Sequence, residues 1–430
     1  MDVNKEFLLL RMRFLLIFTG CFFYSSCFSQ TYTQIKNRYD NYLNYKGSLD
    51  KYVDISAEKI TLYKYTGGKK EIDFAIVKND WCFFSKLLTA IDADSIEKIY
   101  RDIGNYKLKI KNPQTDCFKA RKPLDKVKIM IDPGHMAGNM QMARIEQKYL
   151  HFTKENYATL KQDSVDIAEG ILTFQTASIL KKKLESQGAS VALTRKENFT
   201  SFGCSYEDWI KNNKKKTLDS LLKAGKITPQ KHNSLLQMSK AKFFLEFFKD
   251  YELLQRSRVI NNFKPDLTVI IHYNVNEKNV PWIKPSDKDF CMAFIPGCLI
   301  GDNLETFAGK INFLRWLLCE DVDQSEKISA LLVTELSKQL NIAIAKKGDA
   351  SYLSEHCTAT TSAGVYCRNL ALCRLVQSPL MYGECLYQDN ETECYELLNN
   401  SETVEEIKTN KRVKSAAEAF YNAIVKFYAN

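Results

Sequence analysis

The sequence predicts an α/β protein with an open, twisted, mostly parallel sheet flanked by helices, a helical insertion and a small N-terminal α+β accessory domain. Short apolar, β-branched runs alternate with amphipathic helical patterns between residues 127 and 430, which is typical of βαβ units. A Lys-rich helical stretch at 203–250 interrupts this alternation. A hairpin pattern at 59–77 precedes both.

Size and composition indicate a folded protein with more than one domain. The chain has 430 residues, of which 45% are hydrophobic, with 25 Phe and 22 Tyr; this excludes a largely disordered chain. The formal net charge of +10 favours anionic partners such as acidic lipid or acidic cell-envelope polymers. Because the charge is spread out and no nucleic-acid module is present, we expect no nucleic-acid partner.

Residues 1–29 have the order of a secretory signal peptide. Lys5, Arg11 and Arg13 accompany an apolar run, and small residues follow it. The run is too short and interrupted for a comfortable transmembrane span. We therefore expect a periplasmic or secreted protein. Lipidation of Cys21 or Cys27 would anchor it to the envelope, and a buried N-terminal helix is the alternative.

The cysteines do not predict a metal site. Thirteen are present, and no two have the CxxC spacing of a thiolate zinc site. Many stand in apolar segments, which is typical of core thiols.

Residues 30–122 are predicted to form the accessory domain, whose role the sequence does not indicate. Strands at 59–65 and 71–77 flank a Gly67-Gly68 turn, and a helix at 92–100 and a strand at 106–110 follow. A linker at 121–123 leads into the second domain, 123–430.

The second domain begins with a buried strand at 127–131 that ends in Asp132-Pro133-Gly134-His135. After a long loop, a helical face runs from Ile167 to Leu184, and a strand at 189–194 completes a βαβ unit. Beyond the insertion at 203–250, the expected elements are a helix at 251–263, a strand at 267–271, loop plus helix at 277–320, a helix at 324–345, strands at 370–374 and 378–383, and a helix at 414–428.

Four side chains of this domain are expected at one edge of the sheet. His135, His272 and Glu384 each follow a predicted strand, and Glu169 lies at the start of the crossover helix. Parallel strands bring their like ends together, and ligands of open α/β sheets bind at that edge. Two imidazoles and one carboxylate form the ligand set of a catalytic zinc, and a second carboxylate can act as general base. Spacing alone does not tell which Glu has which role.

Several alternatives stay open at this point. A lone His after a strand is more often structural, and Glu146 and Glu155 in the long loop are rival third ligands. Asp132 is expected to hold its turn or to orient a ligand. Arg256 and Arg374 are expected to pair with carboxylates. The other histidines are expected on the surface or in loops: His151, His232 and His356, the last beside Cys357, where it could approach a metal.

Residues 127–430 resemble the zinc-dependent N-acetylmuramoyl-L-alanine amidases of the family-3 type. Six segments in register carry the resemblance: 131–135, Glu169 with Ala177, 188–195, Arg256 with Asn261, 265–274, and Arg374 with 379–384. The resemblance implies that His135, Glu169 and His272 bind Zn²⁺ and that Glu384 is the catalytic carboxylate. It also implies peptidoglycan as the substrate, cut between N-acetylmuramic acid and L-alanine.

The chain departs from the family pattern without losing any of these four residues. Met136-Ala137 replaces the two Gly that usually follow the first motif, and Thr173, Asn198 and Gly383 replace the usual Asn, Asp and Val. These changes concern substrate recognition and regulation more than the metal.

Two other functions stay open from the sequence. One is a zinc peptidase that cuts within the stem peptide. The other is a non-catalytic wall-binding or regulatory protein. In the non-catalytic protein, residues 30–120 or 203–250 would be the interaction element. For the amidase, a protein regulator could bind through the insertion or the N-terminal domain.

Overall fold

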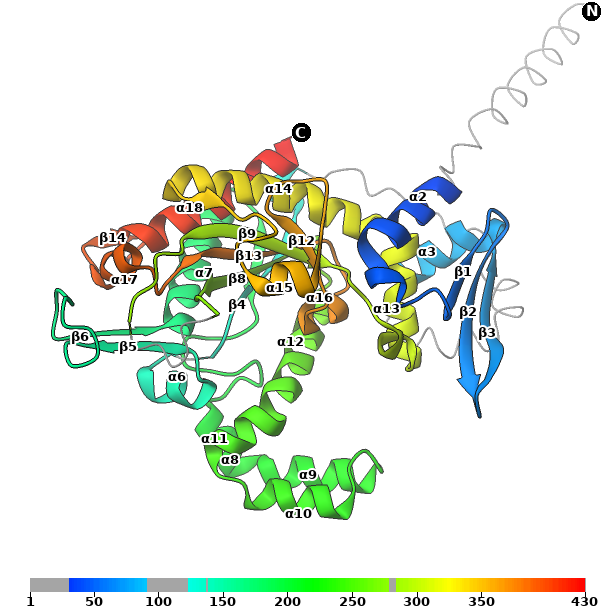
Figure 1. Cartoon of the computed structure of the whole chain (residues 1–430), viewed down its shortest axis with the longest axis horizontal. Coiled ribbons are helices and arrows are strands. Elements are labelled where there is room, and N and C mark those ends of the chain that lie inside the picture. The colour runs from blue at the N-terminus through cyan, green and yellow to red at the C-terminus, as the bar shows by residue number, and fades with distance from the viewer. Residues whose placement is uncertain (1–30, 91–122, 137, 278–283, 430) are drawn as a thin grey trace, which may run out of the picture.

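The computed structural model describes residues 31–90, 123–136, 138–277 and 284–429, which are arranged around an eight-stranded sheet (Figure 1). The strand order is β11-β12-β9-β13-β8-β4-β7, and β10 pairs with β9. The strands are β4 (Lys128–Pro133), β7 (Ser190–Leu193), β8 (Leu267–Asn274), β9 (Phe290–Pro296), β10 (Ala343–Ile344), β11 (Cys357–Ala359), β12 (Val365–Arg368) and β13 (Leu380–Tyr387).

The sheet is mostly parallel, as predicted. Parallel pairing joins β7, β4, β8 and β13, and it also joins β9 to β12 and β10. The antiparallel pairs are β9 with β13 and β11 with β12. The carboxyl ends of β4, β8 and β13 therefore lie at one edge.

Helices cover both faces of the sheet, which confirms the α/β class (Figure 1). On one face lie α7 (Glu169–Ser186), α14 (Asp321–Leu340) and α18 (Lys411–Ala429); near the other lie α12 (Lys249–Phe263) and α16 (Ala371–Leu375). Helices α14 and α18 pack closely against β13. A Cβ at Gly383 would lie 2.7 Å from Phe420 Cζ and 2.9 Å from Leu332 Cδ2. This packing explains why Gly383 replaces the larger residue of the family pattern.

Shorter elements lie around the rim of the sheet. Their bounds are η4 (Leu124–Lys126), α6 (Met140–Glu146), β5 (Tyr149–Thr153), β6 (Ser164–Ala168), η6 (Gly301–Leu304), α13 (Phe307–Leu318), α15 (Ser351–Glu355), α17 (Glu391–Leu398), β14 (Glu402–Val404) and β15 (Ile407–Thr409). Strands β5 and β6 form a hairpin within the long segment between His135 and Glu169.

The insertion is helical, as predicted, and projects away from the sheet (Figure 1). It consists of α8 (Tyr206–Asn212), α9 (Lys214–Lys223), α10 (Pro229–Gln237), α11 (Lys240–Phe243) and η5 (Phe244–Phe248), and α12 begins at its end. Its members bury their own aromatic cluster, with Trp209, Phe243 and Phe248 at most 2% exposed. Met136, from the loop after β4, belongs to the same cluster.

The N-terminal part packs beside α13 and α14 (Figure 1). It contains α2 (Tyr32–Arg38), η1 (Tyr39–Leu43), η2 (Tyr45–Gly47), β1 (Val53–Ile55), β2 (Lys59–Thr66), β3 (Lys69–Val77), η3 (Lys78–Asp80) and α3 (Trp81–Ala90). The β2–β3 hairpin confirms the predicted Gly-Gly turn. Arg38 contacts Asp323 at 2.6 Å, and the Tyr42 hydroxyl donates to Glu326 at 2.5 Å.

Some predictions concern residues outside the described ranges. These are the signal peptide at 1–29, the helix at 92–100 and the strand at 106–110. Within the described ranges, no helix is both long enough and apolar enough to cross a membrane. The ten described cysteines are thiols outside any disulfide, and most of them are buried.

Four predicted elements are wrong in whole or in part. The helix expected at 324–345 ends at Leu340, and Ala343–Ile344 is strand β10. The stretch 277–320 was expected to be loop plus helix, but it also contains β9, which is buried along its whole length and therefore shows no alternation. The stretch 370–374 was expected to be a strand, but Ala371–Leu375 is helix α16. The helical face was expected to begin at Ile167, which instead lies in β6; the helix begins at Glu169.

Candidate active site

The described residues contain one group of His, Cys, Asp or Glu side chains arranged to hold a metal ion, formed by His135, Glu169 and His272. One possible ligand atom from each lies within 4.8 Å of the others. His135 Nε2 lies 3.0 Å from Glu169 Oε2, and His272 Nδ1 lies 2.9 Å from Glu169 Oε1. The sheet thus brings together three of the four residues expected at its edge.

Burial and charge favour the metal-binding protonation states of His135 and Glu169. Burial lowers the pKa of His135 to about 4, against the attraction of Glu169. Burial also opposes ionisation of Glu169, but the two imidazoles outweigh it and hold the pKa of Glu169 well below its usual value. A neutral imidazole and an ionised carboxylate are the forms that bind a metal cation.

Glu384 lies beside this group on β13, where it pairs in register with His272 of β8. Glu384 is 9% exposed. Burial raises the pKa of Glu384 to about 7, while His272 opposes the rise and Glu169 adds to it. Tyr382, two residues earlier, stacks on the His272 ring with centroids 4.7 Å apart and fixes the plane of that imidazole.

Gly134 permits the close approach of the two histidine-bearing strands. A Cβ at this position would lie 2.4 Å from His272 Cε1 and 2.7 Å from the Ile271 carbonyl. The Gly134 N–H donates to that same carbonyl at 3.0 Å. Any larger residue would therefore displace the His272 ring or the Ile271 backbone.

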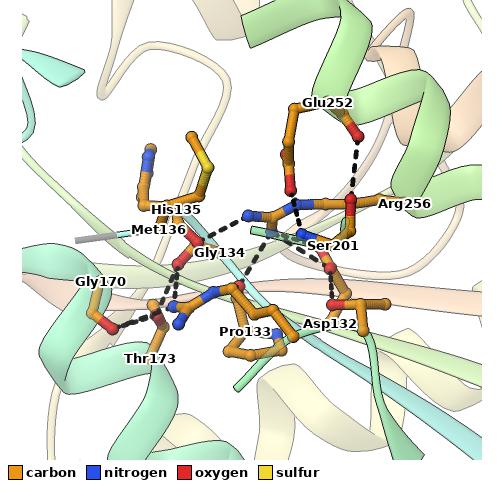
Figure 2. A network of polar contacts seen from close by, with 12 residues as sticks. Asp132, Pro133, Gly134, His135, Met136, Gly170, Thr173, Ser201, Glu252 and Arg256 are labelled. Carbon is orange, nitrogen blue, oxygen red and sulfur yellow. Dashed lines mark hydrogen bonds and ion pairs between the residues drawn. The ribbon is translucent and has the colours of Figure 1, made fainter. Parts of the chain in front are cut away.

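Arg256 of α12 holds the loop that carries His135 (Figure 2). Its guanidinium donates to the carbonyls of Pro133 at 3.0 Å and His135 at 2.7 Å. It also contacts Asp132 at 3.2 Å and Glu252 at 2.7 Å. The predicted pairing of Arg256 with carboxylates is confirmed.

Arg195 and Thr173 bind the same loop from another side. Arg195 donates to the carbonyls of Pro133, Gly134 and Gly170, each at 3.1 Å. The Thr173 hydroxyl donates to Gly134 at 2.7 Å (Figure 2). The contacts with Pro133 and Gly134 provide donors for carbonyls of the turn, and the contact with Gly170 ties the turn to α7.

A cavity of about 200 Å³ opens beside this group. His135, His272 and Tyr382 line one part of it, while Phe244 and Lys249 of the insertion line another. Lys148 is a second cation in the wall. The insertion thus forms part of the wall of the site.

The other candidates lie elsewhere. Glu146 accepts the Met136 N–H at 2.9 Å and Glu155 is exposed, so neither joins the three converging residues. Arg374 donates to Asn369 and not to a carboxylate, contrary to expectation. His232 was expected on the surface or in a loop, but it is buried on α10 and contacts Asp219 at 2.8 Å. The remaining histidines fit the expectation: His151 is half-exposed and His356 is exposed.

Two residues that shape the site were missed from the sequence. Glu252 lies four residues before Arg256, and this i,i+4 spacing could have suggested an ion pair on one helix face. Tyr382 gives no such signal, because its contact with His272 depends on the register of two strands far apart in the sequence.

Comparison with known protein families shows which family the chain belongs to. Residues 129–426 match the family model described as N-acetylmuramoyl-L-alanine amidase. The chain belongs to this amidase family. The amidase is therefore a hydrolase of peptidoglycan, and its family acts on the cell wall, outside the cytoplasm.

Solved structures similar to the amidase share low identity with it. One is the CwlD amidase from Clostridioides difficile in complex with the GerS lipoprotein, with 16% identity, 71% of this chain and 99% of that chain covered, and a TM-score of 0.38. Another is the apo N-acetylmuramyl-L-alanine amidase Ami1 from Mycobacterium abscessus, with 13% identity, 70% and 98% covered, and a TM-score of 0.37. No curated protein matches the sequence. The identification rests on the family match.

Proposed function

We propose that this chain is a Zn²⁺-dependent amidase in which His135, Glu169 and His272 hold the metal. It would cleave the amide that joins the lactyl group of N-acetylmuramic acid to L-alanine. The observation that carries the proposal is the convergence of one ligand atom from each of the three side chains within 4.8 Å.

The donor set fits zinc. Two imidazole nitrogens and one carboxylate are ligands that Zn²⁺ takes in hydrolases that keep one position open. The shifted pKa values of His135 and Glu169 favour the deprotonated forms that this ion needs. When bound, Zn²⁺ polarises a substrate carbonyl and lowers the pKa of water.

Glu384 is the residue that we propose to transfer protons. Its carboxylate would accept a proton from the attacking water and pass it to the nitrogen of the leaving amine. A carboxyl whose pKa is raised to about 7 by burial can exist in both forms near neutral pH. Its place beside His272 and outside the converging three leaves it available for this role.

The test combines metal analysis with mass spectrometry of peptidoglycan digests. We expect one zinc per chain in the wild type and in Glu384→Gln, and reduced zinc in His272→Ala. Glu384→Gln should lower the release of intact stem peptides by roughly 10²- to 10⁴-fold. Full activity in Glu384→Gln would refute the role of Glu384. Shortened peptides would indicate a peptidase, and binding without digestion would indicate a wall-binding protein.

We also propose the location and the division of the chain. The order of charged, apolar and small residues supports a signal peptide at 1–29 and a periplasmic or secreted protein, and N-terminal sequencing of the mature chain would test this. An accessory domain at 30–122 and a catalytic domain at 123–430 remain our division. We also propose that a protein regulator binds the insertion or the N-terminal domain.

A further inference from the structure

One face of the central sheet carries a row of side chains that leads away from the three converging residues. In the register, Glu384 of β13 pairs with His272 of β8, and Tyr382 pairs with Phe294 of β9. Phe294 in turn pairs with Tyr366 of β12, two residues before Arg368. Residues paired across strands, or two apart along one strand, point to the same face. Arg368 therefore shares a face with His272 and Glu384.

The guanidinium of Arg368 is held between two aromatic rings. It lies 4.7 Å from the ring centroid of Phe294 and 4.6 Å from that of Tyr352. Phe294 is fully buried. The Tyr352 hydroxyl accepts a hydrogen bond from Asn274 Nδ2 at 2.7 Å, which fixes its ring. Arg368 is thus positioned by packing before any ligand arrives.

The guanidinium of Arg368 has no hydrogen-bond acceptor within the part of the chain that the structure describes. Among residues 31–90, 123–136, 138–277 and 284–429, none accepts a hydrogen bond from the Arg368 side chain or forms an ion pair with it. Arg195 and Arg256, by contrast, direct their donors at carbonyls and carboxylates of the loop. A half-buried guanidinium normally has an acceptor, because desolvating its N–H groups without one costs free energy.

The Arg368 guanidinium lies close to the proposed active site. Phe294, one of its two clamping rings, lies 5.9 Å from Tyr382, which stacks on His272. Burial raises the pKa of Glu384, and Arg368 is among the positive charges that partly offset this rise. An anionic group bound at Arg368 would therefore belong to a molecule that also reaches Glu384.

We propose that Arg368 binds a free carboxylate on the peptide moiety of the substrate and thereby orients the scissile amide. This inference rests on the proposed function, because it takes the peptide side of the cut bond as the ligand. A planar guanidinium pairs with a carboxylate through two parallel hydrogen bonds, and a peptide always offers such a group unless it is amidated.

The kinetic test compares Arg368→Met with the wild type on synthetic muramyl peptides. One compound has free carboxylates, one has a C-terminal carboxamide, and one has side-chain carboxamides. At alkaline pH, where Glu384 is ionised, Arg368→Met should raise KM for the free acid at least about tenfold with little change in kcat. The wild type should have a raised KM for only one of the two amidated compounds. The position of the carboxamide in that compound identifies the carboxylate that Arg368 binds. Arg368→Lys should restore part of the affinity, since it keeps the charge but not the planar fork.

A binding measurement separates this proposal from the proposed function. Calorimetry with the released peptide alone, on the whole chain, needs no hydrolysis. The wild type should bind the free acid about tenfold more tightly than its amidated form, and Arg368→Met should lose this difference. Equal discrimination by both chains would overturn the role of Arg368. Retained discrimination without any amide cleavage would instead overturn the proposed function. Unchanged melting temperatures would show that Arg368→Met is folded.

Discussion

His135 has a left-handed backbone, with a φ of 60°, although it is not glycine. Such a conformation costs free energy and persists only where its surroundings enforce it. Here the enforcement comes from Arg256, Arg195 and Thr173, whose donors occupy the carbonyls of residues 133–135. These contacts hold the loop in place (Figure 2). The fixed loop keeps His135 Nε2 at 3.0 Å from Glu169 Oε2.

A pair of threonines on α7 tests this support. Thr173→Val removes the hydrogen bond to Gly134, and Thr176→Val removes one to the Tyr273 hydroxyl, one turn away from the loop. Each should cost about 1 kcal/mol of stability, because each removes one buried hydrogen bond; the Gly134 carbonyl keeps Arg195 as a donor. Only Thr173→Val should also weaken zinc binding. Equal zinc affinities of the two variants, measured by competition with a chelator, would show that this hydrogen bond does not position His135.

The raised pKa of Glu384 predicts a pH dependence of hydrolysis. Burial raises this pKa to about 7, and the protonated carboxyl cannot accept a proton from water. Activity should therefore be present above this pKa and fall as the pH drops through it. A bound cation would shift this acid limb to lower pH. The kcat profile of the wild type, with zinc content measured at each pH, checks the limb; a flat profile down to pH of about 4, where an ordinary glutamate titrates, would contradict it.

At the scale of single residues, the reactive groups could be predicted from the sequence, whereas residues that contact and position them could not. His135, Glu169, His272 and Glu384 could be named because each stands at a strand end or helix start. Tyr382 and Arg368 could not, because their contacts depend on strand register and on a strand, β9, that the sequence did not reveal.

At the scale of elements, the insertion is tied to the loop of His135. Met136 follows His135 directly, and its side chain is 4% exposed within the aromatic cluster of the insertion. The insertion also lines the cavity through Phe244 and Lys249. The replacement of Gly by Met at 136 is thus explained, because the Met side chain packs into the aromatic cluster of the insertion and Gly has no side chain to do so.

Two truncations in the aromatic cluster distinguish an effect on the His135 loop from an effect on global stability. Met136→Ala and Leu218→Ala each remove a buried side chain from the cluster, and each should cost about 2–5 kcal/mol. Met136→Ala should in addition weaken zinc binding, because it frees the residue next to His135. Leu218 lies on α9, away from the loop, and should leave zinc affinity unchanged. If both variants lose zinc equally, the effect is one of global stability.

The elements predicted from the sequence were those with strong periodicity or clear turns. The long helices α14 and α18, the β2–β3 hairpin and strand β8 fall in this class. Strand β9 does not, since an apolar run that is buried along its whole length has no period to distinguish strand from helix. Helix α16 has only five residues, which is too short to show a helical period. Their identity is decided by neighbours distant in sequence.

For the whole molecule, the hydrophobic core does not stop at the N-terminal part. One continuous cluster contains Leu43 and Phe84 of that part together with Phe313 and Trp316 of α13. The Leu43 carbonyl also accepts the Leu299 N–H at 2.8 Å. A shared core of this kind couples the unfolding of the parts that it joins.

The described N-terminal part and the catalytic part should therefore unfold together. Leu43→Ala removes a fully buried side chain and should lower stability by about 2–5 kcal/mol, moving one calorimetric transition of the whole chain to lower temperature. Ile72→Ala, in the same part but at a residue that is 60% exposed, should leave the transition in place. Hydrolytic activity after heating should disappear over the same range in each variant. If Leu43→Ala instead splits off a small early transition while activity persists, the N-terminal part is an independent unit that shares contacts with the catalytic part but not its cooperativity.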